Sequence, residues 1–165
     1  MNICGVDYES YVDGKGIRTA IFISGCSKNC FGCHNKRAQS KSYGEPFTDE
    51  VFDTIVSEIK SRPYLSGITL TGGDPFESYN IDECSKLLHD LKTQLNGINI
   101  WVYTGETYEY IHDNFYYALC NIDVLVDGKF DIDQKDRRLA FRGSSNQRII
   151  DVQKSLRNNK VEILM

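Results

Sequence analysis

Three cysteines within eight residues constrain this chain more than any other feature of its sequence. Cys26, Cys30 and Cys33 are separated by three and then two residues. Thiolates held this close together repel one another, so a metal ion or a metal cluster is the natural way to hold them. The remaining three cysteines are scattered along the chain, at Cys4, Cys84 and Cys120. We expect Cys84 and Cys120 to be buried thiols of the core.

The cysteines are not expected to form a disulfide framework. The first residues of the chain lack the basic and apolar stretches of a secretory signal, and no apolar run reaches the ~18 residues of a membrane span. We therefore expect a cytoplasmic protein with no membrane partner, in a compartment where thiols stay reduced. The formal net charge of −4 also argues against nucleic acid as a partner.

The spacing of the three cysteines leaves more than one metal open. Zinc would need His34 as a fourth ligand, but His34 adjoins Cys33 and closes a tetrahedral site poorly. An iron–sulfur cluster normally takes four thiolates, and the loop offers three. The spacing therefore favours a cluster with one open iron, ahead of a zinc site or an incidental group of thiols. An open coordination position marks a reactive centre rather than a structural one.

The length of 165 residues predicts a single domain over residues 1–165. It is too short for a complete eight-unit α/β barrel, which takes about 250 residues. Apolar periodicity predicts strands that alternate with helices, which is typical of a mainly parallel sheet. The predicted strands are 19–23, 68–71, 98–103 and 124–126, with short late candidates at 149–150 and 161–164. The predicted helices are 51–59, preceded by a cap at Thr48, then 81–95 and 108–119.

The loops after three predicted strands carry the residues of greatest chemical interest. They contain Cys26, the pair Gly72-Gly73 and the pair Thr104-Gly105. In parallel sheets the carboxyl ends of the strands meet at one edge, where such folds place their chemistry. We therefore expect the three loops to converge. Periodicity alone does not separate an open, partial barrel from a doubly wound sheet.

The cysteine spacing and its surroundings resemble a known family. Cys26-x₃-Cys30-x₂-Cys33 resembles the cluster motif of the radical S-adenosylmethionine (SAM) superfamily. Residues 13–19 and the pair His34-Asn35 resemble the glycyl-radical activating enzymes of that superfamily. The segments 103–105, 126–130 and 142–148 extend the likeness almost to the end of the chain. Together with the short chain, they resemble the family that activates anaerobic (class III) ribonucleoside-triphosphate reductases.

This resemblance implies a fold, cofactors and partners. The fold would be an open partial (βα) barrel of about five to six mainly parallel strands, of the radical SAM type. Cys26, Cys30 and Cys33 would hold a [4Fe-4S] cluster whose open iron binds SAM, and no further catalytic residue is implied. Reductive cleavage of SAM would then generate a glycyl radical on the large subunit of the reductase. A one-electron donor such as a flavodoxin or a ferredoxin would reduce the cluster.

The resemblance also assigns the residues that contact SAM. Gly32, Cys33 and His34 would line the adenine side. Gly72 and Gly73 would let the backbone approach the methionine end, and Asp74 would bind its amino group. Two alternative functions remain: an activase of another glycyl-radical enzyme, or a zinc-binding interaction module without enzymatic activity.

Overall fold

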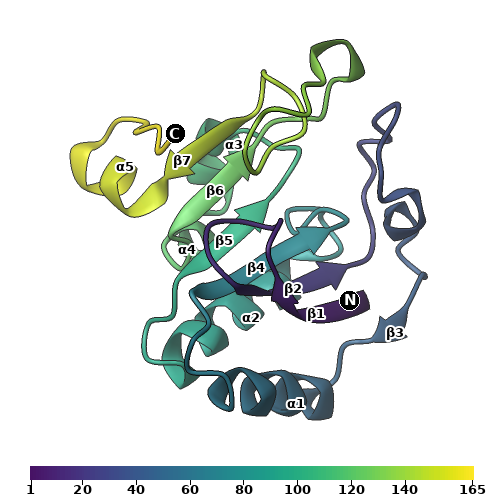
Figure 1. Ribbon diagram of the computed structural model, residues 1–165, viewed down its shortest axis with the longest axis vertical. Coiled ribbons are helices and arrows are strands. Elements are labelled where there is room, and N and C mark those ends of the chain that lie inside the picture. Colours follow the sequence, from purple (N-terminus) through teal and green to yellow (C-terminus); the bar gives the residue numbers. More distant parts are fainter.

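One open sheet of seven strands runs through the computed structural model, which describes residues 1–165 (Figure 1). Its centre consists of four parallel strands: β2 (Arg18–Ile23), β4 (Gly67–Gly72), β5 (Ile100–Tyr103) and β6 (Val124–Asp127). Three antiparallel strands flank them: β1 (Asn2–Ser10), β3 (Glu45–Pro46) and β7 (Arg148–Asp151). The strand order is β3-β1-β2-β4-β5-β6-β7, so the fold is mixed α/β with a partly parallel sheet.

All the helices except the last lie between successive strands of this sheet, and the last follows β7. They are α1 (Asp49–Lys60), α2 (Ile81–Gln94), α3 (Tyr108–Asn114), α4 (Tyr116–Leu119) and α5 (Val152–Asn158), with 3-10 turns η1 (Lys36–Gln39) and η2 (Ile132–Gln134). Helix α1 begins where predicted, because the Thr48 hydroxyl accepts a hydrogen bond from the amide of Val51. None of the helices has the length and apolar character that crossing a bilayer requires.

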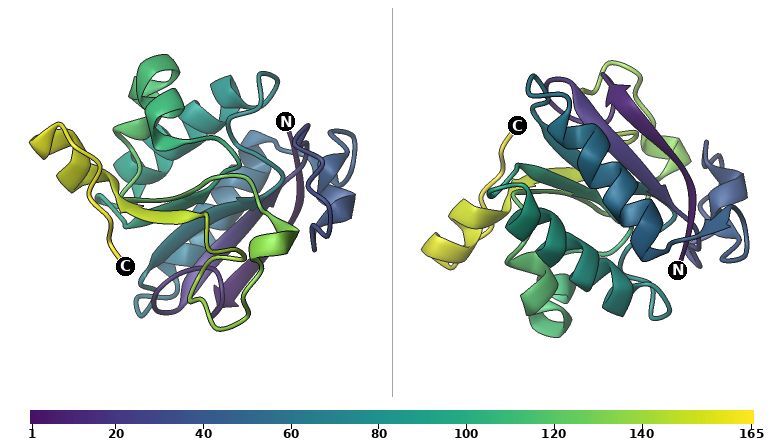
Figure 2. Two further views of the ribbon diagram at one scale, coloured as in Figure 1. Left: turned by 90° about the horizontal axis from the view of Figure 1, so that it is seen from above. Right: turned by 90° about the horizontal axis from the view of Figure 1, so that it is seen from below.

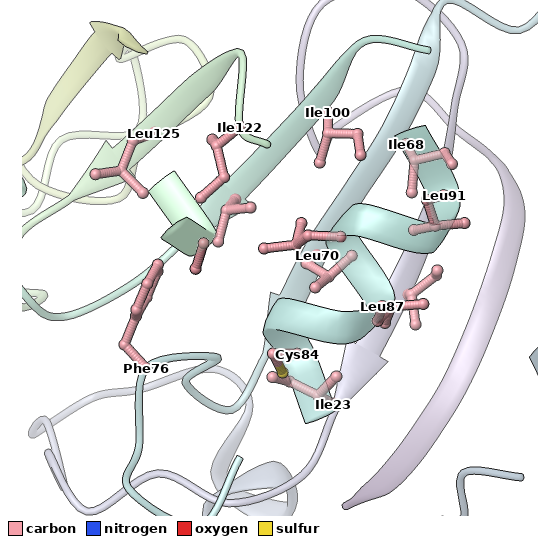
Figure 3. Packing of buried hydrophobic residues seen from close by; sticks show 14 of the residues in the cluster. Ile23, Ile68, Leu70, Phe76, Cys84, Leu87, Leu91, Ile100, Ile122 and Leu125 are labelled. Carbon is pink, nitrogen blue, oxygen red and sulfur yellow. The ribbon is translucent and has the colours of Figure 1, made fainter. Parts of the chain in front are cut away.

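The main core lies between the sheet and the helices α1 and α2. Figure 2 shows these two helices side by side on one face of the sheet. Alternate residues of the strands point toward them, as the two-residue period of a strand requires. Figure 3 shows Leu87 and Leu91 of α2 packed against Ile68 and Leu70 of β4. Cys84 lies in this core and is fully buried, as predicted.

The opposite face of the sheet carries a smaller cluster around Trp101 and a buried arginine. The Arg18 side chain is 1% exposed. It donates hydrogen bonds to Thr69 Oγ1 at 2.9 Å and to the carbonyl of Ile68 at 2.7 Å. Its guanidinium also lies 5.3 Å from the centre of the Trp101 ring. Arg18 therefore ties β2 to β4 and β5 at the amino ends of the parallel strands.

Several sequence predictions need correction. The sheet has seven strands, three of them antiparallel, rather than five to six mainly parallel ones. Strand β1 escaped prediction because it lies near the edge of the sheet and exposes Asp7 and Glu9, so it has no continuous apolar pattern. The predicted helix 108–119 is interrupted at Phe115, whose φ of −136° and ψ of 39° lie outside the helical region. The candidate strand 161–164 contributes only an isolated bridge at Ile163.

The parallel strands bring the three loops of interest to one edge of the sheet. The arrowheads of β2, β4, β5 and β6 point to the same side of the molecule in Figure 1. The cysteine loop follows β2, the Gly72-Gly73 segment ends β4, and Thr104 follows β5. Hydrogen bonds between these loops, described next, confirm the convergence that strand order predicts.

Candidate metal centre

The three clustered cysteines lie in an irregular loop between β2 and η1. All three thiols are free of disulfides and partly exposed. The loop closes on itself, because the amides of Gly25 and Cys26 donate to the carbonyls of Ala38 and Gln39 at 2.6 and 3.0 Å. Within the loop, the Cys33 amide donates to the Cys30 carbonyl at 3.2 Å. The loop is therefore a closed structure that presents three thiols.

Gly72 and Gly73 allow the ends of two neighbouring strands to meet. A Cβ on Gly73 would lie 2.4 Å from the carbonyl oxygen of Gly25, a contact that real side chains do not make. The Gly73 amide donates to Ile23 at 2.7 Å, and the Asp74 amide donates to Gly25 at 2.8 Å. These close approaches are between β4 and the start of the cysteine loop. The glycines thus fix the position of that loop.

Asp74 is a buried carboxylate that joins the loops after β4 and β5. Its side chain accepts hydrogen bonds from Thr104 Oγ1 at 2.8 Å, from the Gly105 amide at 2.9 Å and from the Phe76 amide at 3.0 Å. Burial raises the pKa of Asp74, although these three donors oppose the shift. Both oxygens therefore already have partners within the chain, in addition to any role toward a cofactor.

Two residues that sequence reasoning missed also hold the cysteine loop. Glu77 is 8% exposed, and its Oε1 accepts hydrogen bonds from the amide and the hydroxyl of Ser27 at 2.6 and 2.7 Å. Asn80 Nδ2 donates to the carbonyl of Ser24 at 2.9 Å. Both follow the Gly72-Gly73 segment and precede α2. Polar residues between a strand end and a helix are the signal that could have revealed them.

Lys28 and Glu106 form a third link between the loops. The Lys28 ammonium is ion-paired with the Glu106 carboxylate, and both side chains are about four-fifths buried. A Cβ on Gly105 would lie 3.0 Å from Cγ of Lys28, so the lysine stem lies over this glycine. The cysteine loop is therefore held by the β4 loop on one side and by the β5 loop on the other.

The charges around Cys26 are predominantly negative. Its Sγ and the carboxylate oxygens of Asp74 and Glu77 lie within 4.8 Å of one another. Burial raises the pKa of the Cys26 thiol to about 11; the Lys28 amide opposes this and the two carboxylates add to it. Burial also lowers the pKa of the Lys28 ammonium, but Glu106, Asp74 and Glu77 outweigh burial, so that this pKa is raised overall.

The residues on either side of Cys33 have different surroundings. Gly32 has a φ of +74°, and a Cβ there would lie 2.8 Å from Ile132, which lines a cavity of about 380 Å³ together with Phe31. Cys33 and the exposed His34 instead line an open cavity of about 610 Å³ that also includes Cys4. The structure therefore does not gather Gly32, Cys33 and His34 around a single cavity.

Cys120, predicted to be buried, is exposed because the four-residue α4 ends at the surface.

The donor atoms fit an iron–sulfur cluster better than a single zinc ion. The convergent set of potential metal ligands is Cys26, Asp74 and Glu77, and no histidine joins it. A tetrahedral zinc site would require the cysteines and His34 to meet at one point. Ligands of a cluster bind different irons and need not converge in this way. Three free thiols in one closed loop match that requirement.

Comparison with known proteins agrees with this geometry. Residues 12–150 match the family described as "4Fe-4S single cluster domain". Relatives named anaerobic ribonucleoside-triphosphate reductase-activating protein include that of Escherichia coli, which is 39% identical over 137 residues, covering 82% of this chain and 89% of the relative.

The Vibrio cholerae protein of that name is 40% identical over 137 residues, covering 82% of this chain and 88% of the relative. That of Haemophilus influenzae is 37% identical with the same coverage. These alignments cover most of both chains, and the residues that match the family, 12–150, include the cysteine loop. The chain therefore belongs to the family of anaerobic ribonucleoside-triphosphate reductase-activating proteins, within the 4Fe-4S single cluster domain family.

Proposed function

We propose that this chain is an enzyme that activates an anaerobic ribonucleoside-triphosphate reductase by generating a glycyl radical on its large subunit. The observation that carries the proposal is the closed cysteine loop, whose three free thiols lie beside the loops after β4 and β5. Cys26, Cys30 and Cys33 would hold a [4Fe-4S] cluster and leave one iron for SAM. When bound, this pair of cofactors supplies one-electron reductive cleavage of SAM, which yields the radical that removes hydrogen from glycine.

The protein residues bind and orient the cofactors in this proposal. Gly72 and Gly73 form the backbone edge at the methionine end, and Asp74 holds that edge against the β5 loop. Because the carboxylate of Asp74 already has three donors, an amino group of SAM would share Oδ1 or Oδ2 with them. Gly32, Cys33 and His34 lie on the adenine side in this proposal, with Cys33 and His34 lining the same open cavity.

The same proposal assigns the fold type and the partners. The chain acts as a single domain over residues 1–165, and its sheet is the open partial barrel of radical SAM enzymes. The glycine segment of the partner completes the site. A flavodoxin or a ferredoxin supplies the electron. No nucleic acid or membrane takes part.

Anaerobic reconstitution with iron and sulfide tests this function. The reconstituted protein should show an iron–sulfur absorbance and, once reduced, convert SAM to methionine and 5′-deoxyadenosine. Mixed with the reductase subunit, it should give a glycyl-radical signal in electron paramagnetic resonance. Stoichiometric zinc without SAM cleavage would instead indicate the zinc-binding module. A radical on another glycyl-radical enzyme but not on the reductase would reassign the partner.

A further inference from the structure

The surroundings of Cys26 contain more buried negative charge than the chain neutralises by ion pairs. Asp74 is 1% exposed and Glu77 is 8% exposed. Neither carboxylate forms an ion pair with any lysine, arginine or histidine. Their hydrogen bonds come from hydroxyl groups and backbone amides. Buried carboxylates without a nearby cation are costly, and three thiolates beside them would add to that cost.

Lys28 is the cation that the fold holds next to this acidic group. It lies two residues from Cys26 and two from Cys30. The stem of Lys28 crosses Gly105, whose amide donates to Asp74 at 2.9 Å. Ser27, the residue before Lys28, donates two hydrogen bonds to Glu77. The ion pair with Glu106 fixes the position of the ammonium. The lysine is therefore confined between the cysteine loop and the two carboxylates.

We propose that Lys28 is a positioning residue whose fixed positive charge offsets Asp74 and Glu77 and so favours the reduced state of the metal centre. The proposal rests on the proposed function, because it assumes a cluster on the three cysteines. Adding an electron to such a cluster increases its negative charge, and net charge is one of the factors that set its potential. A cation nearby stabilises the reduced state relative to the oxidised one. Glu106 holds that cation in place, and its own negative charge offsets part of the effect of the cation.

Three variants separate this role from a purely mechanical link between loops. Lys28→Met keeps the stem and removes the charge, Lys28→Arg keeps a charge, and Glu106→Gln breaks the ion pair but leaves the lysine charged. Lys15→Met, an exposed lysine at the opposite end of β2, is the control. The measurement is a potentiometric titration of the reconstituted cluster, in which electron paramagnetic resonance monitors the reduced cluster. Iron content and the urea midpoint of the cluster-free protein are measured in parallel.

We expect Lys28→Met to shift the cluster potential downward. At the wild-type midpoint the ratio of reduced to oxidised cluster should fall by at least about tenfold, because at an effective dielectric constant of about 20 a unit charge about 12 Å away already changes that ratio about tenfold. Lys28→Arg and Lys15→Met should stay near the wild-type potential, and Glu106→Gln should not fall below it. Equal downward shifts in Lys28→Met and Glu106→Gln would indicate a mechanical link and overturn the proposal.

The failure of this inference is distinguishable from failure of the proposed function. If the wild-type protein binds no iron–sulfur cluster or does not cleave SAM, the proposed function itself is wrong. If the wild-type protein does both and Lys28→Met has an unchanged potential, only the role of Lys28 is wrong. The Lys28→Met protein could be too unstable to hold the cluster. In that case a lowered potential in Lys28→Arg would also overturn the proposed role of Lys28, because a variant that keeps the positive charge would then have lost its effect on the potential.

Discussion

Thr104 Oγ1 donates a hydrogen bond of 2.8 Å to the buried carboxylate of Asp74 and thereby joins loops that follow two different strands. The Gly105 amide adds a second bond to the other oxygen of the same carboxylate. The Asp74 amide in turn donates to Gly25, at the start of the cysteine loop. One aspartate thus links all three loops at the edge of the sheet where the metal centre is proposed.

Replacing a clustered cysteine should abolish the metal centre. Cys30→Ala removes one of the three proposed thiol ligands, and we expect the reconstituted protein to lose most of its iron and its SAM cleavage. Cys120→Ala is the matched control, because Cys120 is a free thiol exposed at the end of α4. Iron and sulfide analysis with absorbance spectra provides the measurement. Full iron content in Cys30→Ala would exclude this residue from the ligand set.

Asp74→Asn should destabilise the protein even without cofactors. The new amide group places a donor opposite the Gly105 amide or the Thr104 hydroxyl, so one buried donor loses its acceptor. We expect a cost of about 1–3 kcal/mol in the free energy of unfolding. Thr104→Val removes one of the three bonds to Asp74 and the hydroxyl that accepts from the Glu106 amide at 3.0 Å, and it should cost no more than Asp74→Asn. Urea unfolding of the cluster-free proteins measures both, and a larger loss in Thr104→Val would contradict this account.

Gly73→Ala should disturb the cysteine loop through a steric clash. The added methyl group would lie 2.4 Å from a backbone oxygen of Gly25, which cannot rotate away as a side chain could. We expect a loss of about 1–3 kcal/mol in stability and reduced iron uptake. Gly97→Ala is the comparison, since its Cβ meets nothing within 4 Å and only its φ of +73° opposes the change. Gly97→Ala should keep full iron uptake; equal loss in both variants would refute the steric explanation.

Arg18→Met should be strongly destabilising. The change leaves Thr69 and the carbonyl oxygens of Ile68 and Asn99 without the guanidinium that now donates to them. We expect a loss of about 1–3 kcal/mol, the usual cost of buried polar groups left without a hydrogen-bond partner. Arg138→Met, at a side chain that is 90% exposed, should change stability by less than about 0.5 kcal/mol. Thermal unfolding that fails to separate the two variants would refute this role for Arg18.

Acid should weaken one link between α3 and β7. Arg148 donates two hydrogen bonds to Glu109, and these lower the pKa of Glu109 below its ordinary value. A lowered folded-state pKa contributes stability above the unfolded pKa of about 4.3, and that stability is lost as the pH falls through the folded value. Because Glu109 is half exposed, the contribution should stay below about 1 kcal/mol.

Glu109→Gln isolates this contribution. The difference in unfolding free energy between the wild-type protein and Glu109→Gln should be present at pH 7 and low ionic strength, and should shrink toward zero near pH 3. Urea unfolding at both pH values provides the measurement. A difference that grows on acidification would have the wrong sign for a lowered carboxylate pKa.

The sequence predicted the alternation of strands and helices and the loops that carry chemistry. Apolar periodicity located β2, β4, β6 and the helices α1 and α2, because these elements are buried on at least one continuous face. It failed for β1, whose exposed Asp7 and Glu9 interrupt the pattern, and for the boundary between α3 and α4 at Phe115. Edge strands and short helices depend on neighbours that periodicity does not reveal.

The cysteine spacing by itself predicted a metal centre, because three of the proposed ligands lie within eight consecutive residues. The tertiary structure alone decided what holds those residues in place. Ser27 meets Glu77 across 50 residues, and Lys28 meets Glu106 across 78. Such pairs form because parallel strands end at one edge of the sheet, so that loops distant in the chain become neighbours. Which polar side chains meet there depends on register and packing, which local sequence does not contain.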